Sequence, residues 1–280
     1  MNTFLSENQK NSLFRLLADD DPSTLSLVKQ QLFAQGESAV PAIEKWLKEA
    51  HGSPAEHHLM EVLNRLKQGH CHAEFLDLCT RAASMPDLDL EEASFLLAST
   101  EYSATNMSRY RTMLDEMADE VKLQTAHKGN PSEIRALSLV LHEKYGFRGN
   151  RNHYYEAENT YLNRVLERKV GVPITLSLLY ILLGKRLNLQ IHGVALPGHF
   201  IIRWQEQFFD PFKNGRLLTE TACKQIVEDR GQEFRPGYLN PATPIQVLRR
   251  MLMNLARVYE IEEDRLRLAR IRQYLQALEV

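Results

Sequence analysis

Hydrophobic positions in the first 85 residues recur with the spacing of one-sided helices, and Pro and Gly residues separate the runs. Gly69 is predicted to end the last of these helices. Together the runs predict an all-helical region over residues 1–86. Four such runs occupy Leu13–Leu17, Leu25–Phe33, Ala42–Leu47 and Leu59–Leu66.

From Asp87 onward the helical spacing continues until about residue 145, interrupted by a polar run at residues 125–131 that predicts a surface loop. The segment Pro173–Leu187 is different, because apolar side chains cover nearly every side of it. A helix that is apolar all round is a buried one, so this segment is predicted to be the central helix of a domain.

After Leu189 the pattern becomes typical of strands, with short runs rich in Val, Ile, Phe and Trp between polar and Pro-Gly turns. The last 35 residues return to helical spacing and predict a helical hairpin. The fold class is therefore α+β, in three parts: an all-helical region over 1–86, a central domain over 87–245 and a helical hairpin over 246–280. The predicted strands are Gln190–Leu196, His199–Trp204 and Gln207–Phe209.

Composition narrows the class of protein. Lys and Arg number 34 against 36 Asp and Glu, a formal net charge of −2, which argues against a nucleic-acid-binding protein. No apolar run approaches the ~18–20 residues that span a bilayer, and the chain start has no signal-peptide pattern. Three cysteines, an odd number, fit a reducing compartment. We therefore expect a cytoplasmic protein that binds neither nucleic acid nor membrane.

Three stretches carry the candidate chemistry: the start of the buried helix at Gly171-Val172-Pro173, the run Pro197–Arg203 with His199, and Phe209–Phe212 with Asp210. A helix start favours a thiolate, a neighbouring imidazole deprotonates it, and a carboxylate orients the imidazole. His199 and Asp210 lie 11 residues apart across a predicted hairpin turn. Their side chains can therefore meet if both point to the same side of the sheet.

Residues 87–245 resemble the SirB-type branch of the transglutaminase-like, papain-like superfamily, which is also related to a domain of some F-box proteins. The resemblance implies a papain-like core with a buried central helix on a small antiparallel sheet. The first 85 residues resemble HEAT-type helical pairs, and the C-terminal hairpin resembles the start of a tetratricopeptide tail that is cut short here. Besides the three stretches above, the matching segments are Asp89–Ala93, Tyr145–Asn150 and Asn159–Leu166.

The active transglutaminases carry Gly-x-Cys at the helix start, whereas this chain carries Pro173 at the position of the nucleophile. Proline suits the first position of a helix but has no nucleophilic atom. None of Cys71, Cys79 and Cys223 lies at a comparable position. The resemblance implies that the branch as a whole commonly lacks this cysteine, so thiol chemistry is not expected.

Two readings of His199 remain. The imidazole is either a structural or ligand-binding group paired with Asp210, which the missing nucleophile favours, or a general base. In the second reading a hydroxyl of Thr175 or Ser177 replaces the thiol, which requires a well-placed His–Asp pair and an oxyanion hole.

We expect neither a metal nor a cofactor. One group of histidines and cysteines lacks the repeated spacing of a zinc site and is better explained by surface imidazoles and small buried thiols. Its members are His57, His58, His70, Cys71, His72 and Cys79. Seven arginines between Arg249 and Arg272 alternate with acidic residues, as on solvated helix faces. No Gly-rich loop supports phosphate binding there.

Two functions follow. The first is a non-catalytic module that binds a protein or peptide in the groove of a degenerate papain-like domain. The alternative is a hydrolase or acyltransferase that uses Ser177 or Thr175 with His199 and Asp210. A hydroxyl within about 3 Å of the His199 ring would favour the enzyme, and a position filled by Pro173 would favour the module. The sequence fixes no oligomeric state.

Overall fold

The computed structural model describes residues 7–19, 21–82, 88–103, 105–126 and 132–279. The chain divides into two compact units, and the boundary falls inside helix α4 (Pro54–Ala82). Three parts of the predicted organisation lie outside the described residues. They are the boundary between residues 86 and 87, the start of the chain, and residues 127–131 of the predicted loop. Unit 1 comprises Met1–Glu74 and Ser99–Thr105, and unit 2 comprises Phe75–Ala98 and Asn106–Val280.

Unit 1 is built from helices, as its apolar spacing predicts. Asp21 caps α2 by accepting the backbone N–H of Thr24 at 2.8 Å, which explains why the Asp-Pro sequence starts a helix here. Leu17, Ile43 and Leu59 are fully buried in a core that the helices share. The described residues up to Ala82 contain helices and no strand, and the likeness to HEAT pairs stays a prediction. The helices are α1 (Glu7–Leu17), α2 (Pro22–Ala34), the short turn η1 (Gly36–Ala39), α3 (Val40–Glu49) and α4.

The prediction that Gly69 ends a helix is wrong, because α4 continues through Gly69 to Ala82. A glycine inside a helix costs only about 1 kcal/mol relative to alanine. Beyond it, Phe75 and Cys79 are fully buried, and their burial outweighs that cost.

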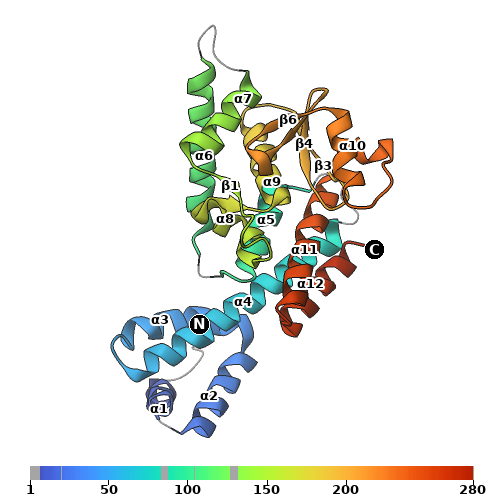
Figure 1. The fold of residues 1–280 in the computed structure, drawn as a ribbon. Helices are drawn as coiled ribbons and strands as arrows, with labels where there is room; N and C mark the ends of the chain where they lie inside the picture. Colours follow the sequence, from blue (N-terminus) through green and yellow to red (C-terminus); the bar gives the residue numbers. More distant parts are fainter. Residues whose placement is uncertain (1–6, 20, 83–87, 104, 127–131, 280) are drawn as a thin grey trace. The chain divides into compact units, whose positions relative to one another are not determined.

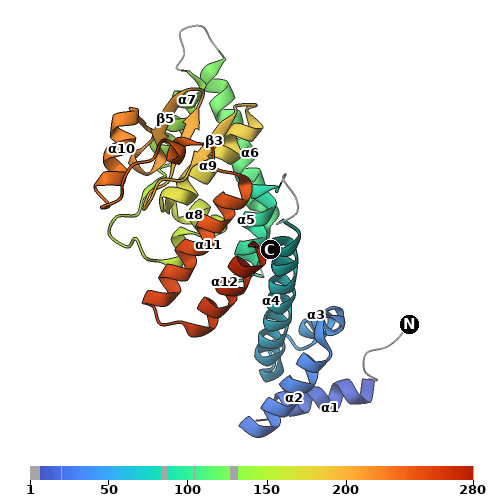
Figure 2. The same cartoon turned by 90° about the vertical axis from the view of Figure 1, so that its right-hand side faces the viewer.

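Unit 2 is organised around α9 (Pro173–Arg186), which is buried along its length as predicted. This helix packs against two helices, α6 (Met107–Thr125) and α11 (Pro244–Ile261), and against two strands, β3 (Ile191–Val194) and β4 (Ile201–Trp204) (Figures 1 and 2). The helices around it are α5 (Leu90–Ser99), α6 (Met107–Thr125), α7 (Glu133–Ser138) with its π-helical continuation η2 (Leu139–Lys144), α8 (Leu162–Arg168), α10 (Glu220–Glu228), α11 (Pro244–Ile261) and α12 (Arg265–Ala277).

The sheet is a four-stranded antiparallel meander, β3-β4-β5-β6, which confirms the predicted antiparallel strands. Gln205, with φ +53°, forms the tight turn between Trp204 and its partner Gln207. The strand expected to open at His199 begins two residues later, because Leu196–His199 forms a turn with Gly198 at φ +68°. The strands are β3 (Ile191–Val194), β4 (Ile201–Trp204), β5 (Gln207–Asp210) and β6 (Arg216–Leu218).

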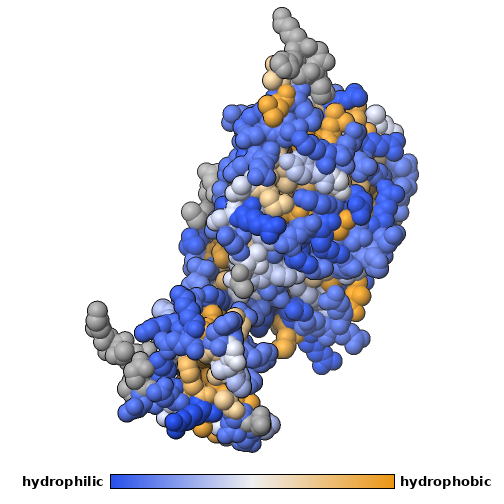
Figure 3. All heavy atoms as spheres, turned by 90° about the vertical axis from the view of Figure 1, so that its left-hand side faces the viewer, coloured by the Kyte–Doolittle hydropathy of each residue, from blue (hydrophilic) through white to orange (hydrophobic). Residues whose placement is uncertain are grey.

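Smaller elements complete unit 2. A parallel pair, β1 (Arg148–Gly149) with β2 (Val170–Gly171), precedes α9, and α11 and α12 form the predicted helical hairpin. None of the described helices is both long and apolar enough to cross a membrane. Figure 3 shows a face covered largely by hydrophilic residues, with scattered hydrophobic patches. The remaining short turns are η3 (Ala157–Asn159), η4 (Pro211–Lys213) and η5 (Pro236–Leu239).

Candidate functional site

His199 and Asp210 lie against each other in unit 2. His199 closes the turn before β4, and Asp210 ends β5, so the antiparallel pairing of β4 with β5 brings the two residues together. The distance from His199 Nε2 to Asp210 Oδ2 is 3.0 Å. The other carboxylate oxygen, Oδ1, accepts the backbone N–H of Phe212 at 3.1 Å, and Lys213 Nζ lies 3.8 Å from Oδ2.

This contact fixes the role of one ring nitrogen. A carboxylate oxygen accepts hydrogen bonds, so Nε2 of His199 carries the proton that it donates to Asp210 Oδ2. No group in the described ranges hydrogen-bonds Nδ1. The His199 side chain is buried but lines a hollow, so a bound molecule can reach it.

That hollow, the His199 hollow, has a volume of about 220 Å³, and both Pro173 and His199 line it. Pro173 is the first residue of α9, where its ring needs no N–H, as predicted. At the position predicted to carry a nucleophile, the side chain therefore presents only carbon atoms. The lining residues are Tyr154, Pro173, His199, Phe212, Lys213, Ile226, Asp229 and Arg230.

The Thr175 hydroxyl is engaged at the start of α9. Its Oγ1 donates to the carbonyl oxygen of Asn159 at 2.7 Å and accepts the N–H of Val172 at 3.1 Å. A Cβ on Gly171 would lie 2.7 Å from this oxygen, which explains the glycine before the helix. Thr175 is fully buried and caps the helix.

Ser177 is also fully buried, and its hydroxyl donates to the carbonyl oxygen of Phe200 at 3.5 Å. Within the described ranges, neither Ser177 nor Thr175 hydrogen-bonds His199 or lines its hollow. The structure thus brings His199, Asp210 and Pro173 together and places both hydroxyls elsewhere.

Aromatic rings line the approach to His199. Phe212 lies edge-on to both His199 and Tyr154, at centroid distances of 6.2 and 6.1 Å, and Tyr154 is edge-on to Tyr155 at 5.2 Å. These four rings form what we call the aromatic track. Sequence reasoning missed Tyr154 and Tyr155, because no periodic pattern marks a residue in a loop.

The buried amide of Asn159 positions this track. Its Nδ2 donates to the backbone carbonyl oxygens of His153 and Tyr154, at 2.7 and 3.2 Å, and its Oδ1 accepts from Asn150 Nδ2 at 3.0 Å. Asn150 and Asn159 belong to two of the segments that carry the family resemblance. In addition, the Phe212 ring lies where a Cβ on Gly149 would be, so that glycine makes room for the ring.

A second hollow, the arginine hollow, adjoins the first and shares Tyr154 and Arg230 with it. Arg250 Nη2 donates to the carbonyl oxygens of Leu196 and His199, at 3.4 and 3.2 Å, and so holds the turn that carries His199. Sequence reasoning treated this arginine as one of a solvated set. The volume is about 470 Å³, and the lining residues are Tyr154, Tyr155, Gly198, Arg230, Arg250, Met253, Asn254 and Arg257.

A third hollow, of about 460 Å³, contains His142 of the π-helical segment. Its Nδ1 donates to the carbonyl oxygen of Phe147 at 2.7 Å, and its Nε2 lies 2.9 Å from the hydroxyl oxygen of the buried Tyr180. Burial lowers the pKa of His142, so the ring is neutral at neutral pH.

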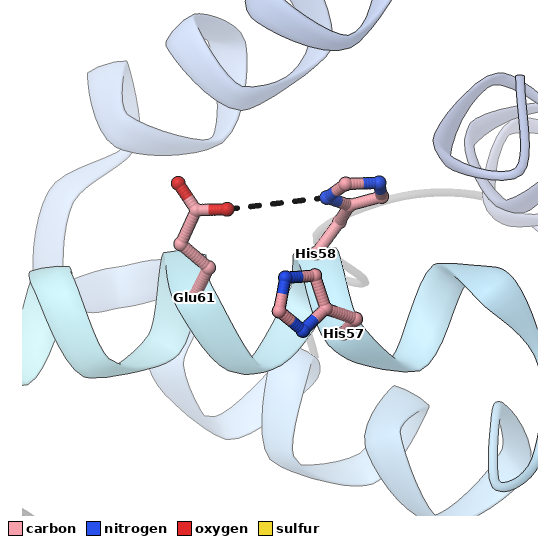
Figure 4. A group of neighbouring side chains, drawn as sticks. All are labelled: His57, His58 and Glu61. Carbon is pink, nitrogen blue, oxygen red and sulfur yellow. Dashed lines mark ion pairs between the residues drawn. The ribbon is translucent and has the colours of Figure 1, made fainter. Parts of the chain in front are cut away.

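Ligand atoms of His57, His58 and Glu61 lie within 4.8 Å of one another, and they are the one such group found in the described ranges. Figure 4 shows both imidazoles and the carboxylate on successive turns of α4. However, Lys29 Nζ lies 2.5 Å from Glu61 Oε2 and places a positive charge beside the carboxylate. This geometry favours an ion pair over a metal centre.

Comparison with known proteins identifies the family of the chain. Residues 108–253 match the transglutaminase-like superfamily. A UPF0162 protein of Xylella fastidiosa is 32% identical over 197 residues, which cover 66% of this chain and 70% of that protein. A UPF0162 protein of Vibrio cholerae is 24% identical over 203 residues, or 69% of this chain and 74% of that protein.

A eukaryotic relative is longer. Mouse F-box only protein 21 is 30% identical over 158 residues, which cover 52% of this chain but 24% of that protein. No solved structure matches the chain at a significant level. The matched segment contains α9, the sheet, His199 and Asp210. The chain therefore belongs to the transglutaminase-like superfamily, and its bacterial relatives place it in the UPF0162 family.

Proposed function

We propose that this protein is a non-catalytic module that binds a segment of a partner protein in the His199 hollow. The observation that carries the proposal is the lining of this hollow. Pro173 stands at the first position of α9, where the helix dipole would activate a nucleophile, and in the same hollow Nδ1 of His199 has no hydrogen-bond partner among the described residues. The imidazole can accept a hydrogen bond from a ligand, whereas the proline supplies no side-chain nucleophile for acyl transfer through a covalent intermediate.

The surroundings of the hollow support binding. The aromatic track provides flat apolar surface with phenol groups at one end, which suits an extended peptide whose side chains pack on rings while its backbone N–H groups donate. An occurrence of the same domain inside the longer F-box only protein 21 fits a module that serves different protein contexts.

The alternative function, a hydrolase or acyltransferase that uses Ser177 or Thr175, requires a hydroxyl beside His199. Both hydroxyls are buried and donate to backbone carbonyl oxygens, so either one would have to leave a structural hydrogen bond to react. We therefore favour the binding module.

Site-specific photo-crosslinking in living cells tests the proposal. A photoreactive amino acid at Lys213, which lines the His199 hollow, is expected to capture one dominant protein. The matched control is the same amino acid at Lys224, an exposed lysine of α10 that lies outside the lining and faces Glu228. The crosslinked segment, made as a synthetic peptide, should then shift the His199 ring signals of the full chain in NMR spectra.

Identical capture from both positions would contradict the proposal, as would a synthetic segment that leaves the His199 signals unchanged. Ester or amide hydrolysis by the purified chain that His199→Ala abolishes would favour the enzyme instead.

Finer assignments belong to the same proposal. We place the chain in the SirB-type branch, regard α11 and α12 as a single tetratricopeptide-like unit, and keep the division into parts at residues 86 and 245. We also propose a cytoplasmic location, which the free state of Cys71, Cys79 and Cys223 supports.

A further inference from the structure

Two guanidinium groups face the arginine hollow without a carboxylate of their own. Arg257 pairs with Glu260 at 2.8 Å, but among the described residues neither Arg230 nor Arg250 forms an ion pair. Arg250 uses its Nη2 for the carbonyl oxygens of Leu196 and His199, which leaves the remaining N–H groups for other partners.

The two charges are close enough to act on each other. Burial lowers the pKa of the Arg250 guanidinium, the Tyr154 phenol acts in the opposite direction, and the charge of Arg230 lowers the pKa further. Arg250 is partly buried and Arg230 is exposed, and an anion that contacts both guanidinium groups would offset their mutual repulsion. Such a pair suits an oxyanion, because both guanidinium groups can donate charge-assisted hydrogen bonds to it.

The backbone fixes the position of Arg230. Its side chain lies across Gly198, where a Cβ would come 3.1 Å from Nη1 and 3.3 Å from Cγ. Gly198, at φ +68°, belongs to the turn whose carbonyl oxygens accept hydrogen bonds from Arg250. Both arginines thus contact the turn before His199, and Arg230 lines both hollows, so an anion bound by Arg230 and Arg250 lies next to the His199 hollow.

We propose that the arginine hollow binds an anionic group of a peptide, a side-chain carboxylate or a phosphate, through Arg230 and Arg250. The inference rests on the proposed function and names its ligand: the segment bound beside His199 is acidic. Tyr154 links the two hollows, so one peptide can place its anionic residue on the arginines and its next residues along the aromatic track.

A peptide is favoured over a nucleic acid for two reasons. The chain carries a net charge of −2, so its overall field does not attract a polyanion. The unpaired positive charge of this hollow is also confined to two guanidinium groups, which matches one or two anionic residues rather than a phosphate backbone.

The test uses the full chain and three short peptides of equal length. One alternates glycine with glutamate, the second carries phosphoserine in place of glutamate, and the third carries glutamine. We expect the glutamate or the phosphoserine peptide to shift the Arg230 and Arg250 Nε–H signals in NMR spectra, and the stronger binder identifies the anion. Added salt should weaken this binding.

The deciding comparison is between Arg230→Gln and Arg249→Gln. Arg249 lies on the same helix as Arg250 but pairs with Glu279 outside the hollow. Arg230→Gln is expected to reduce affinity for the preferred anionic peptide about tenfold, the loss of a charge-assisted hydrogen bond, whereas Arg249→Gln should leave it unchanged. Equal affinity of the two variants would overturn the proposal.

Other outcomes separate this inference from the proposed function. If the glutamine peptide shifts the His199 signals as strongly as the acidic peptides and no arginine signal moves, the anion site is wrong and the binding module stands. If the acidic peptides move the arginine signals and leave His199 unchanged, the anion site stands and the His199 hollow is not the binding site. An oligothymidylate that displaces both acidic peptides would overturn the assignment to a peptide.

Discussion

Nε2 of His199 lies 3.0 Å from Oδ2 of Asp210, while Oδ1 of the same carboxylate accepts the N–H of Phe212. One fully buried carboxylate therefore fixes both the turn before β4 and the start of η4. We expect Asp210→Ala to lower the free energy of unfolding by about 1–3 kcal/mol, because a buried ring N–H and a backbone N–H lose their acceptor. Urea denaturation measures this change. Asp229→Ala, which removes an exposed carboxylate, is the control, and an equal effect of the two variants would refute the structural role.

Replacing Pro173 by cysteine tests the alignment with active transglutaminases. Pro173→Cys places a thiol at the first position of α9 beside His199, where the helix dipole and the imidazole favour the thiolate. We expect this variant to react with iodoacetamide at neutral pH faster than the wild type, and His199→Ala in the same background to remove most of the gain.

The three native cysteines are expected to react slowly with iodoacetamide in that measurement. Burial raises the pKa of Cys79 to about 12 and that of Cys223 to about 11, and it also raises the pKa of Cys71. A thiol at position 173 that reacts no faster than these three would show that the position is not aligned with the nucleophile.

The neutral ring of His142 should make the protein sensitive to acid. Its folded-state pKa lies below the ordinary value of about 6.5, so the unfolded chain takes up the proton first as the pH falls. The neutral ring therefore contributes its full stabilisation above the unfolded-state pKa of about 6.5, and this contribution is lost as the pH falls toward the folded-state pKa. The urea midpoint of the wild type should therefore fall between about pH 7 and about pH 5, and that of His142→Gln should fall less. His192→Gln, at an exposed position of β3, is expected to follow the wild type.

Glu91 links α5 to the end of α9. Its carboxylate accepts from Arg186 at 2.5 and 3.1 Å and from Arg111 at 3.2 Å, and the residue is 8% exposed. Arg186 also pairs with Asp115 and Arg111 with Glu92, so Glu91→Ala removes three hydrogen bonds to a nearly buried carboxylate without leaving a bare charge, and it should destabilise unit 2 by about 1–3 kcal/mol. Glu92→Ala removes an exposed partner of Arg111 and should cost less than about 1 kcal/mol. Chemical denaturation compares them, and similar midpoints would contradict the role of Glu91.

The elements that can be predicted best from the sequence are those whose pattern of apolar and polar residues is local and continuous. The buried helix at Pro173 and the turn at Gln205 are examples, because continuous apolar character and a polar break between strands are local properties. The prediction that a helix ends at Gly69 failed because a single glycine is a weak helix breaker when buried residues follow it.

The site was harder to predict than the fold. His199 and Asp210 could be paired from their spacing and from a family resemblance, but the engagement of Thr175 with Asn159 depends on a hydrogen bond between segments 16 residues apart. Arg230 and Arg250 gave no signal, since arginines are common on helix surfaces and only the fold shows which of them lack a carboxylate.

Asn159 connects the start of the central helix α9 to the loop that carries Tyr154. Its backbone carbonyl accepts from Thr175 at the start of α9, while its side chain holds the backbone of Tyr154 and is itself held by Asn150. One buried residue, Asn159, thus forms hydrogen bonds both to the central helix and to the loop that carries part of the aromatic track. A genetic screen for binding-defective alleles would recover substitutions at Asn159 together with low protein abundance. Selection for stability at Asn159 would therefore also preserve the shape of the aromatic track.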